Sequence, residues 1–182
     1  MYLISVYFDH KTNHTLQNYI NRIAAKTGNT FMTDNQVPPH MTISAIEAKS
    51  AEILQPGFMS LKGKITQGMV SFVSVGQLLP YVMYVTPVLN GYLSDISQQV
   101  DEAVKNIPEI SVSKYYRPLS WLPHVTMGKQ LDKWQMVKAL EVMQECFVPF
   151  EATITEIGLA KVNPHEDIVR FMLERENTPS RC

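Results

Sequence analysis

The chain has 182 residues, enough to bury one substantial core, and its 45% hydrophobic and 18% charged content is ordinary for a globular protein. Its formal net charge of −1 lacks the basic excess of proteins that bind long nucleic acids, which favours a small or short ligand. The sequence contains no Cys-x-x-Cys pair, no apolar segment of membrane length and no recognisable targeting segment, so we expect a cytoplasmic protein with reduced cysteines.

The first half of the chain alternates strand patterns with helix patterns. Residues 2–8 are rich in β-branched and aromatic side chains, which predicts a buried strand. Residues 15–26 carry apolar side chains at helical spacing, and Gly28 is a reasonable stop. The remaining patterns predict a strand over 41–46, a short helix over 51–61 and a strand over 68–76.

The second half repeats this order. The patterns predict, in turn, a strand over 81–87, a helix over 89–104, a short strand over 125–128, a helix over 131–147, and strands over 152–160 and 168–173 separated by a turn at 163–165. The helix over 131–147 has the clearest periodicity. Its apolar side chains in register are Trp134, Val137, Leu140 and Met143, which we expect to face the core.

The offset between the two halves is nearly constant, since His124 lies 84 residues after His40 and the strands near 70 and 155 are similarly spaced. This regularity predicts an internal repeat, over 1–80 and 81–173, within one bilobal domain of residues 1–182. Residues 174–182 are polar and are expected to fray. The predicted fold is α+β, with two lobes related by a pseudo-twofold axis and equivalent residues facing one central cleft.

Two of the five histidines occupy the same tetrapeptide at equivalent places in this repeat. The first is Pro39-His40-Met41-Thr42 and the second is Pro123-His124-Val125-Thr126. Because side chains at i and i+2 of a strand share a face, each histidine should project together with its threonine. The two lobes would then present two imidazoles and two hydroxyls to one cavity.

These four groups suit phosphodiester chemistry. Imidazole titrates near neutral pH, so one histidine can accept the proton of an attacking water or hydroxyl while the other protonates the leaving oxygen. Threonine hydroxyls can donate hydrogen bonds to the non-bridging phosphate oxygens and stabilise the charge of the transition state. The sequence therefore predicts His40 and His124 as the catalytic pair and Thr42 and Thr126 as phosphate-binding residues, with no metal and no cofactor.

The two motifs resemble the signature of the two-histidine (2H) phosphoesterase superfamily, which includes the 2′-5′ RNA ligase-like proteins and the RNA 2′,3′-cyclic phosphodiesterases. The resemblance covers the motifs, their separation and the order of strands and helices around each. It implies a bilobal fold with antiparallel sheets flanked by helices, and metal-free hydrolysis of cyclic phosphates or 2′-5′ linkages in RNA processing. It does not fix the substrate.

Aromatic and basic residues near the motifs are candidates for substrate binding. Tyr116, Arg117 and Trp121 lie in the loop before the second motif, where they could stack on a base and hold a phosphate, or pack on the lobe surface. Tyr7 and Tyr84 lie on strands that should neighbour the motif strands, where each lines the groove or packs in the core.

Several alternatives stay open. The same site could act on a 2′-5′-linked oligoadenylate, a cyclic nucleotide or dinucleotide, or a cyclic phosphate of ADP-ribose, and a non-catalytic nucleotide- or RNA-binding module is also possible. A metallophosphoesterase is disfavoured, because His10 and His14 lack the His-Glu-x-x-His pattern and no carboxylate-histidine ligand cluster is visible. We expect a monomer whose partner is a nucleotide or an RNA end, with no membrane and no bound metal.

Overall fold

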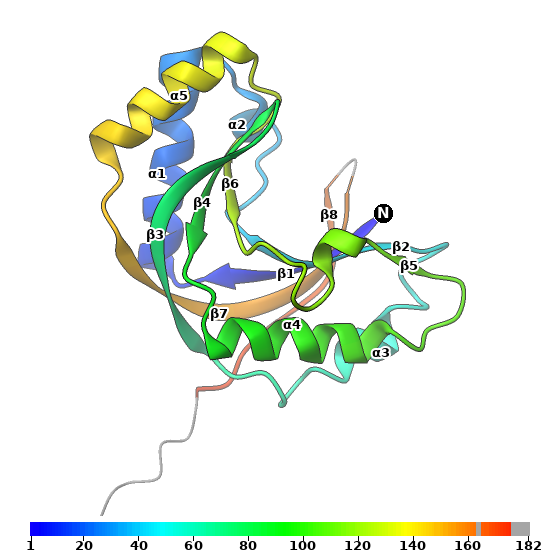
Figure 1. Cartoon of the computed structure of the whole chain (residues 1–182). Helices are drawn as coiled ribbons and strands as arrows, with labels where there is room; N and C mark the ends of the chain where they lie inside the picture. Colours follow the sequence, from blue (N-terminus) through cyan, green and yellow to red (C-terminus); the bar gives the residue numbers. More distant parts are fainter. Residues whose placement is uncertain (163–164, 176–182) are drawn as a thin grey trace, which may run out of the picture.

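The computed structural model describes residues 1–162 and 165–175. Within these residues the strands form one eight-stranded sheet, and every pair of strands in it is antiparallel (Figure 1). The strands are β1 (Tyr2–Phe8), β2 (Met41–Glu47), β3 (Gly68–Leu78), β4 (Val82–Pro87), β5 (Ser111–Val112), β6 (Val125–Gly128), β7 (Phe150–Lys161) and β8 (Glu166–Met172). The α+β class and the antiparallel sheet are therefore as predicted.

Three long helices pack around this sheet, and each begins at a side chain that caps its first turn. They are α1 (His10–Thr27), α4 (Gly91–Val104) and α5 (Lys133–Cys146); the shorter helices are α2 (Phe31–Asp34), α3 (Gln55–Met59) and the 3-10 turn η1 (Lys114–Tyr116). The caps are Asp9, Asn90 and Asp132, whose side-chain oxygens accept backbone N–H groups at 2.8–2.9 Å. These caps explain why α1 begins before the predicted residue 15, and α4 and α5 after residues 89 and 131.

The path of hydrogen-bonded strands closes on itself. The order is β1-β2-β6-β4-β3-β7-β8, and β7 also pairs with β1. Strand β7 is long enough to serve both parts of the sheet, because its residues 150–154 pair with β3 and its residues 154–161 pair with β1. The two motif strands, β2 and β6, are neighbours at the opposite side of this path. The sheet thus holds the two motifs together at one place.

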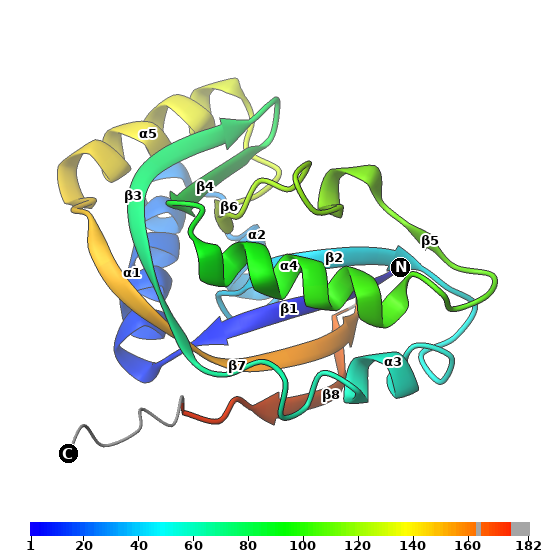
Figure 2. The same cartoon turned by 60° about the horizontal axis from the view of Figure 1, so that its bottom comes forward.

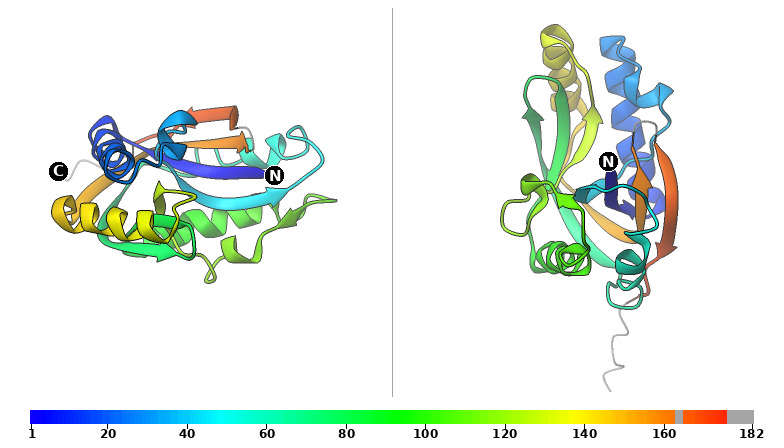
Figure 3. Two further views of the ribbon diagram at one scale, coloured as in Figure 1. Left: turned by 90° about the horizontal axis from the view of Figure 1, so that it is seen from above. Right: turned by 90° about the vertical axis from the view of Figure 1, so that its right-hand side faces the viewer.

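Helices α1 and α4 each pack against strands and helices of the half of the chain to which they do not belong. Helix α1 follows β1 but packs against α5 and β6, whereas α4 follows β4 but packs against β2 and α3. Figure 2 shows α4 with α3 near its end, and both views of Figure 3 show α1 and α5 side by side. Each half therefore supplies a helix that supports the motif strand of the other half.

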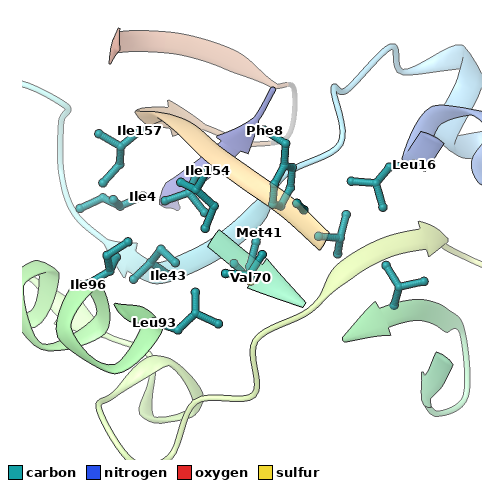
Figure 4. Packing of buried hydrophobic residues seen from close by; sticks show 14 of the residues in the cluster. Ile4, Phe8, Leu16, Met41, Ile43, Val70, Leu93, Ile96, Ile154 and Ile157 are labelled. Carbon is teal, nitrogen blue, oxygen red and sulfur yellow. The ribbon is translucent and has the colours of Figure 1, made fainter. Parts of the chain in front are cut away.

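One hydrophobic cluster fills the space between the sheet and the helices. Figure 4 shows its centre, where Ile4, Met41 and Ile43 meet side chains of α4, β3 and β7. Met41 and Ile43 of β2 are 0% and 1% exposed, and Val125 and Met127 of β6 are both 0% exposed. In each motif, one of these residues lies between the histidine and the threonine and the other follows the threonine. The predicted alternation of buried apolar residues with the motif residues is therefore present.

The buried face of α5 differs from the prediction. Met143 is buried and Leu140 packs against the core, as predicted, but Trp134 is 76% and Val137 48% exposed, and Met136 and Ala139 are buried in their stead. The prediction followed the largest apolar side chains, but α5 packs against α1 through a neighbouring stripe that includes the small Ala139. Small residues allow two helices to approach closely, and a pattern of large apolar residues does not register this.

The ends of the second half lie partly outside the described residues. Positions 163 and 164 of the predicted turn and residues 176–182 of the predicted tail are among those not described. Glu174, which we expected in the frayed tail, pairs with Thr66 and accepts the backbone N–H of Gln67 at 2.8 Å. None of the helices in the described part of the chain is both long and apolar enough to cross a membrane.

The assignment of the α5 face predicts the stability of two variants. Met143→Ala removes a side chain that is 1% exposed, so it should lower the free energy of unfolding by about 2–5 kcal/mol. Trp134→Ala should change it by about 0.5 kcal/mol or less, because most of the indole lies in solvent. Urea denaturation of both variants provides the comparison, and a larger loss for Trp134→Ala would contradict the assigned face.

Candidate functional site

The site forms where the two motif strands meet. Strands β2 and β6 pair antiparallel through Met41 and Val125, the residues directly after the two histidines. In this register His40 comes opposite Thr126, and Thr42 comes opposite His124. Because the side chains of Met41 and Val125 point into the core, the flanking residues point to the other face of the sheet. The pairing of Met41 with Val125 thus places both histidines and both threonines next to one another on one face of the sheet.

The two imidazoles are oriented by the same hydrogen bond. Nδ1 of His40 lies 2.9 Å from the carbonyl oxygen of Pro38, and Nδ1 of His124 lies 2.8 Å from that of Leu122. A carbonyl can only accept, so Nδ1 must carry the proton in both rings. The neutral imidazoles therefore have a free Nε2 lone pair. Diagonal neighbours in an antiparallel pair are about 7–8 Å apart, which leaves room for a small anion between the two Nε2 atoms.

Both imidazoles favour the neutral form. Burial lowers the pKa of His40, and the charge of Lys129 and that of His165 or His124 when protonated lower this pKa further. The bond to the Pro38 carbonyl acts in the opposite direction. Burial also lowers the pKa of His124, again with partial compensation from its carbonyl partner. The positive charge of Lys129 near His40 makes this region attractive to an anion.

The motif threonines and the backbone beside them are held by residues that the sequence reasoning missed. The hydroxyl of Ser5 on β1 donates to Oγ1 of Thr42 at 3.4 Å, which leaves the hydroxyl proton of Thr42 free to donate. The hydroxyl of Thr86 on β4 donates to the carbonyl of Pro123 at 2.7 Å. The only sequence signal for these two was a polar residue in an otherwise apolar strand.

An apolar pocket opens next to His124. It has a volume of about 610 Å³ and lies between the tip of the β3–β4 hairpin and the loop around η1. Its lining residues are Leu78, Leu79, Tyr115, Tyr116, Ser120, Leu122 and His124. Apart from the imidazole, none of these side chains can carry a charge at neutral pH. The pocket therefore suits an uncharged, flat group rather than a second phosphate.

The predicted substrate-binding residues are distributed unevenly around the site. Tyr116 lines the pocket beside His124, and Tyr7 and Tyr84 lie against the imidazoles of His40 and His124. We therefore retain Tyr116 as a candidate for substrate binding, whereas Tyr7 and Tyr84 are in contact with the catalytic candidates themselves.

Arg117 and Trp121 are engaged elsewhere, which corrects their predicted placement. The guanidinium of Arg117 donates to Oδ1 of Asp101 on α4 at 2.8 Å. Trp121 is 7% exposed, and its indole N–H donates to the backbone carbonyl of Thr42 at 3.0 Å. Because its indole N–H already bonds to the backbone of the first motif strand, Trp121 supports that strand from the buried side and does not line the groove.

The other histidines lie outside the two motifs, although the charge of a protonated His165 acts on His40. His10 and His14 are exposed on the first turns of α1, and Nε2 of His165 lies 3.3 Å from Oδ1 of Asp167. Over residues 1–162 and 165–175, no three histidine, cysteine, aspartate or glutamate side chains come close enough to hold a metal ion.

The lowered pKa values predict how stability depends on pH. An imidazole titrates near pH 6.5 in the unfolded chain and below this value in the folded protein, so the unfolded state binds more protons as the pH falls. The contribution of the two neutral imidazoles to the free energy of unfolding is therefore fully present above about pH 6.5 and is lost as the pH falls through their folded-state pKa values.

Two asparagine variants isolate this contribution. The amide of asparagine can still donate to the carbonyl but does not titrate, so His40→Asn and His124→Asn should each lose less stability than the wild type between about pH 7.5 and 5.5. Urea denaturation at both pH values measures the difference. Equal losses in the wild type and both variants would mean that neither histidine is buried in its neutral form.

No protein-family model and no curated protein sequence matches the chain. Solved structures do match it over nearly its whole length. A phosphoesterase has a TM-score of 0.64 and 15% identity, covering 96% of this chain and 98% of its own. LigT of E. coli, in a complex with 3′-AMP, has a TM-score of 0.61 and 15% identity, with 94% and 97% covered.

A third solved structure has a similar arrangement of strands and helices. The PDE domain of MHV ns2 matches with a TM-score of 0.51 and 10% identity, covering 94% of this chain and 96% of that domain. Identities this low establish the arrangement of strands and helices and nothing finer. The chain therefore shares the fold of this phosphoesterase, of LigT and of the PDE domain, in agreement with the fold that the resemblance of its two motifs implies.

Proposed function

We propose that the chain is a metal-independent phosphodiesterase that hydrolyses nucleoside or RNA-terminal 2′,3′-cyclic phosphates, or related 2′-5′ phosphodiester linkages. One observation carries the proposal: His40 and His124 flank a single strand pairing, and each is held in the same tautomer by the same backbone hydrogen bond. A structural histidine needs no matched partner, whereas acid-base catalysis at phosphorus needs a general base and a general acid facing one site, and two imidazoles can fill these two roles.

The reaction follows from the two Nε2 atoms. The substrate phosphate lies between them, and the neutral imidazole accepts the proton of the attacking water through its Nε2 lone pair. The other imidazole is protonated and donates its Nε2 proton to the ribose oxygen as the bond from phosphorus to that oxygen breaks. The product is a phosphate monoester, and each histidine ends in the protonation state from which the other began.

The threonines hold the phosphate during this exchange. Thr42 and Thr126 flank the strand pairing on the same face as the histidines, and the hydroxyl of Thr42 is free to donate. Donors aimed at the non-bridging oxygens stabilise the negative charge that develops at phosphorus, and they need no reorganisation when the reaction occurs. The cationic surroundings of His40 act in the same direction.

The apolar pocket beside His124 supports a nucleoside as the substrate. It offers tyrosine and leucine side chains that can cover the faces of a base, and it adjoins one of the proposed catalytic groups directly. The net charge of −1 agrees with a short substrate. Structures of the similarly folded LigT contain ATP, 3′-AMP and NADP+, so this fold accommodates nucleotides in that protein.

A nucleotide-binding module without catalysis is the alternative from another functional class. Both histidines and both threonines are present, and His40, His124 and Thr42 have supporting hydrogen bonds, which favours catalysis. Cyclic nucleotides, cyclic dinucleotides, 2′-5′-linked oligoadenylates and a cyclic phosphate of ADP-ribose remain candidate substrates for the same four groups.

The central test measures product formation from the four nucleoside 2′,3′-cyclic monophosphates in the presence of EDTA. The wild type should show turnover, and His40→Ala and His124→Ala should each lower the rate by about 10²–10⁴-fold, the usual contribution of a general acid or base. His14→Ala serves as the control and should keep wild-type turnover, since this imidazole is exposed on helix α1.

Three outcomes would contradict the proposal in different ways. Loss of turnover in EDTA indicates a metal-dependent reaction. Full activity of one histidine variant removes that residue from the mechanism. Binding of these nucleotides without turnover of any proposed substrate supports the binding module instead.

The pocket is tested by a pair of tyrosine variants. Tyr115 lines the pocket and is 66% exposed, whereas Tyr81 lies outside this pocket at a similar exposure of 59%. Stacking on a base contributes about 1–3 kcal/mol, so Tyr115→Ala should raise KM about 5-fold or more, and Tyr81→Ala should not change it. Equal KM values for both variants would show that the base does not enter this pocket.

A further inference from the structure

Each motif histidine has a tyrosine ring beside it. The ring centres of Tyr84 and His124 lie 5.2 Å apart with an angle of 57° between their planes. Tyr7 and His40 are 6.1 Å apart at 45°. Both pairs lie within the range of favourable tilted aromatic contacts. The tyrosines come from the strands next to the motif strands, since β4 pairs with β6 and β1 pairs with β2.

Each tyrosine ring lies across a glycine of the strand on its other side. Gly76 of β3 is the cross-strand partner of Tyr84, and a Cβ at residue 76 would overlap the Tyr84 ring. A Cβ at Gly158 of β7 would come within 3.0 Å of Cε2 of Tyr7. A side chain at residue 76 would lift the tyrosine off the sheet, so the glycine allows the ring to lie flat and reach the imidazole.

The two halves achieve this contact differently. Tyr84 is opposite Thr126 in the strand register, whereas continuing the register of β1 and β2 places Tyr7 opposite His40. Tyr7 is covered by the guanidinium of Arg170, 3.5 Å from the ring centre, and burial raises the pKa of Tyr7 to about 12. Among the described residues no cationic side chain lies over the ring of Tyr84, and this ring packs on Gly76.

The hydrogen bond from Nδ1 alone does not fix an imidazole. The ring of His124 can still rock about the line between its Nδ1 and the Leu122 carbonyl, which moves Nε2 sideways. A tyrosine ring packed against one side of the imidazole, with the two planes tilted by 57°, restricts this rocking. Displacement of a reacting atom by 1 Å can cost about 10²-fold in rate, so the constraint has a catalytic consequence.

We propose that Tyr84, seated on Gly76, is a positioning residue that fixes the imidazole plane of His124 and thereby aims its Nε2 at the substrate phosphate. The proposal rests on the function assigned above. It gives Tyr84 a role different from substrate binding, and it gives Gly76 a role in activity although this glycine does not touch the reacting groups.

Four variants separate positioning from packing and from substrate contact. Tyr84→Ala and Gly76→Ala should each lower kcat by about 10–10²-fold with little change in KM, because both remove the ring from His124. Tyr84→Phe keeps the ring and should stay near wild-type activity. Gly91→Ala is the matched control, since a Cβ at that glycine meets nothing within 4 Å.

The double variant tests whether Gly76 acts through Tyr84. If it does, Gly76→Ala combined with Tyr84→Ala should be no less active than the worse single variant, because the space left by the ring accepts the new Cβ. If the double variant instead lost activity by the product of the two single losses, the two residues would act independently. That result would overturn the proposal that Gly76 acts by holding the Tyr84 ring.

An NMR titration of His124 gives a readout that needs no substrate. The titratable groups near the His124 imidazole are His40, Tyr84 and the pocket residues Tyr115 and Tyr116, and its Nδ1 is bonded to the Leu122 carbonyl. In Tyr84→Ala the imidazole gains solvent, so its pKa should rise toward the ordinary value of about 6.5, whereas Tyr84→Phe should leave it unchanged. Thermal unfolding of each variant confirms that the folded protein is being measured.

The outcomes distinguish this proposal from the proposed function. A wild type without turnover refutes the function, while the His124 titration still decides the positioning role. An unchanged His124 pKa and kcat in folded Tyr84→Ala would overturn the positioning role. A Tyr84→Phe variant as impaired as Tyr84→Ala would overturn it too, because the hydroxyl rather than the ring would then be required.

Discussion

The structure depends on one strand pairing, that of Met41 with Val125 between β2 and β6. This contact joins two segments that are 84 positions apart in the sequence, and its antiparallel register alone puts two imidazoles and two hydroxyls on one face. A shift of either motif strand by one residue would turn its histidine and threonine into the core and bring Met41 or Val125 to the surface. Burial of these two side chains at 0% exposure therefore fixes the geometry of the site.

The rest of the fold keeps this pairing in place. Strand β7 closes the sheet by pairing with both β1 and β3, so the motif strands cannot move apart without opening the closed path. Helices α1 and α4 each support the motif strand of the opposite half. Trp121 adds a direct link, since it precedes the second motif and bonds to the backbone of Thr42 in the first. Neither half can thus complete the site alone.

Much of this arrangement was predictable from the sequence, because periodicity and repetition are local properties. The strand over 125–128 and the alternation of His40 with Met41 follow from a period of two, and the repeated tetrapeptide identifies the motifs. The closed path of β7 and the exchange of helices depend on contacts between distant residues, which no local pattern encodes. Gly76 is an example of a role that the sequence does not reveal. The sequence pattern indicates a strand boundary at this glycine, whereas in the structure the ring of Tyr84 packs on it.

The most direct measurement of the central claim is a phosphate titration followed by ¹⁵N NMR of the histidine side chains at constant pH. Free protein should show Nδ1 protonated and Nε2 unprotonated in His40 and His124, as the bonds to Pro38 and Leu122 require. Inorganic phosphate should then shift both Nε2 signals along one shared saturation curve, because one anion lies between them. A response from only one histidine, or two separate curves, would contradict a common site.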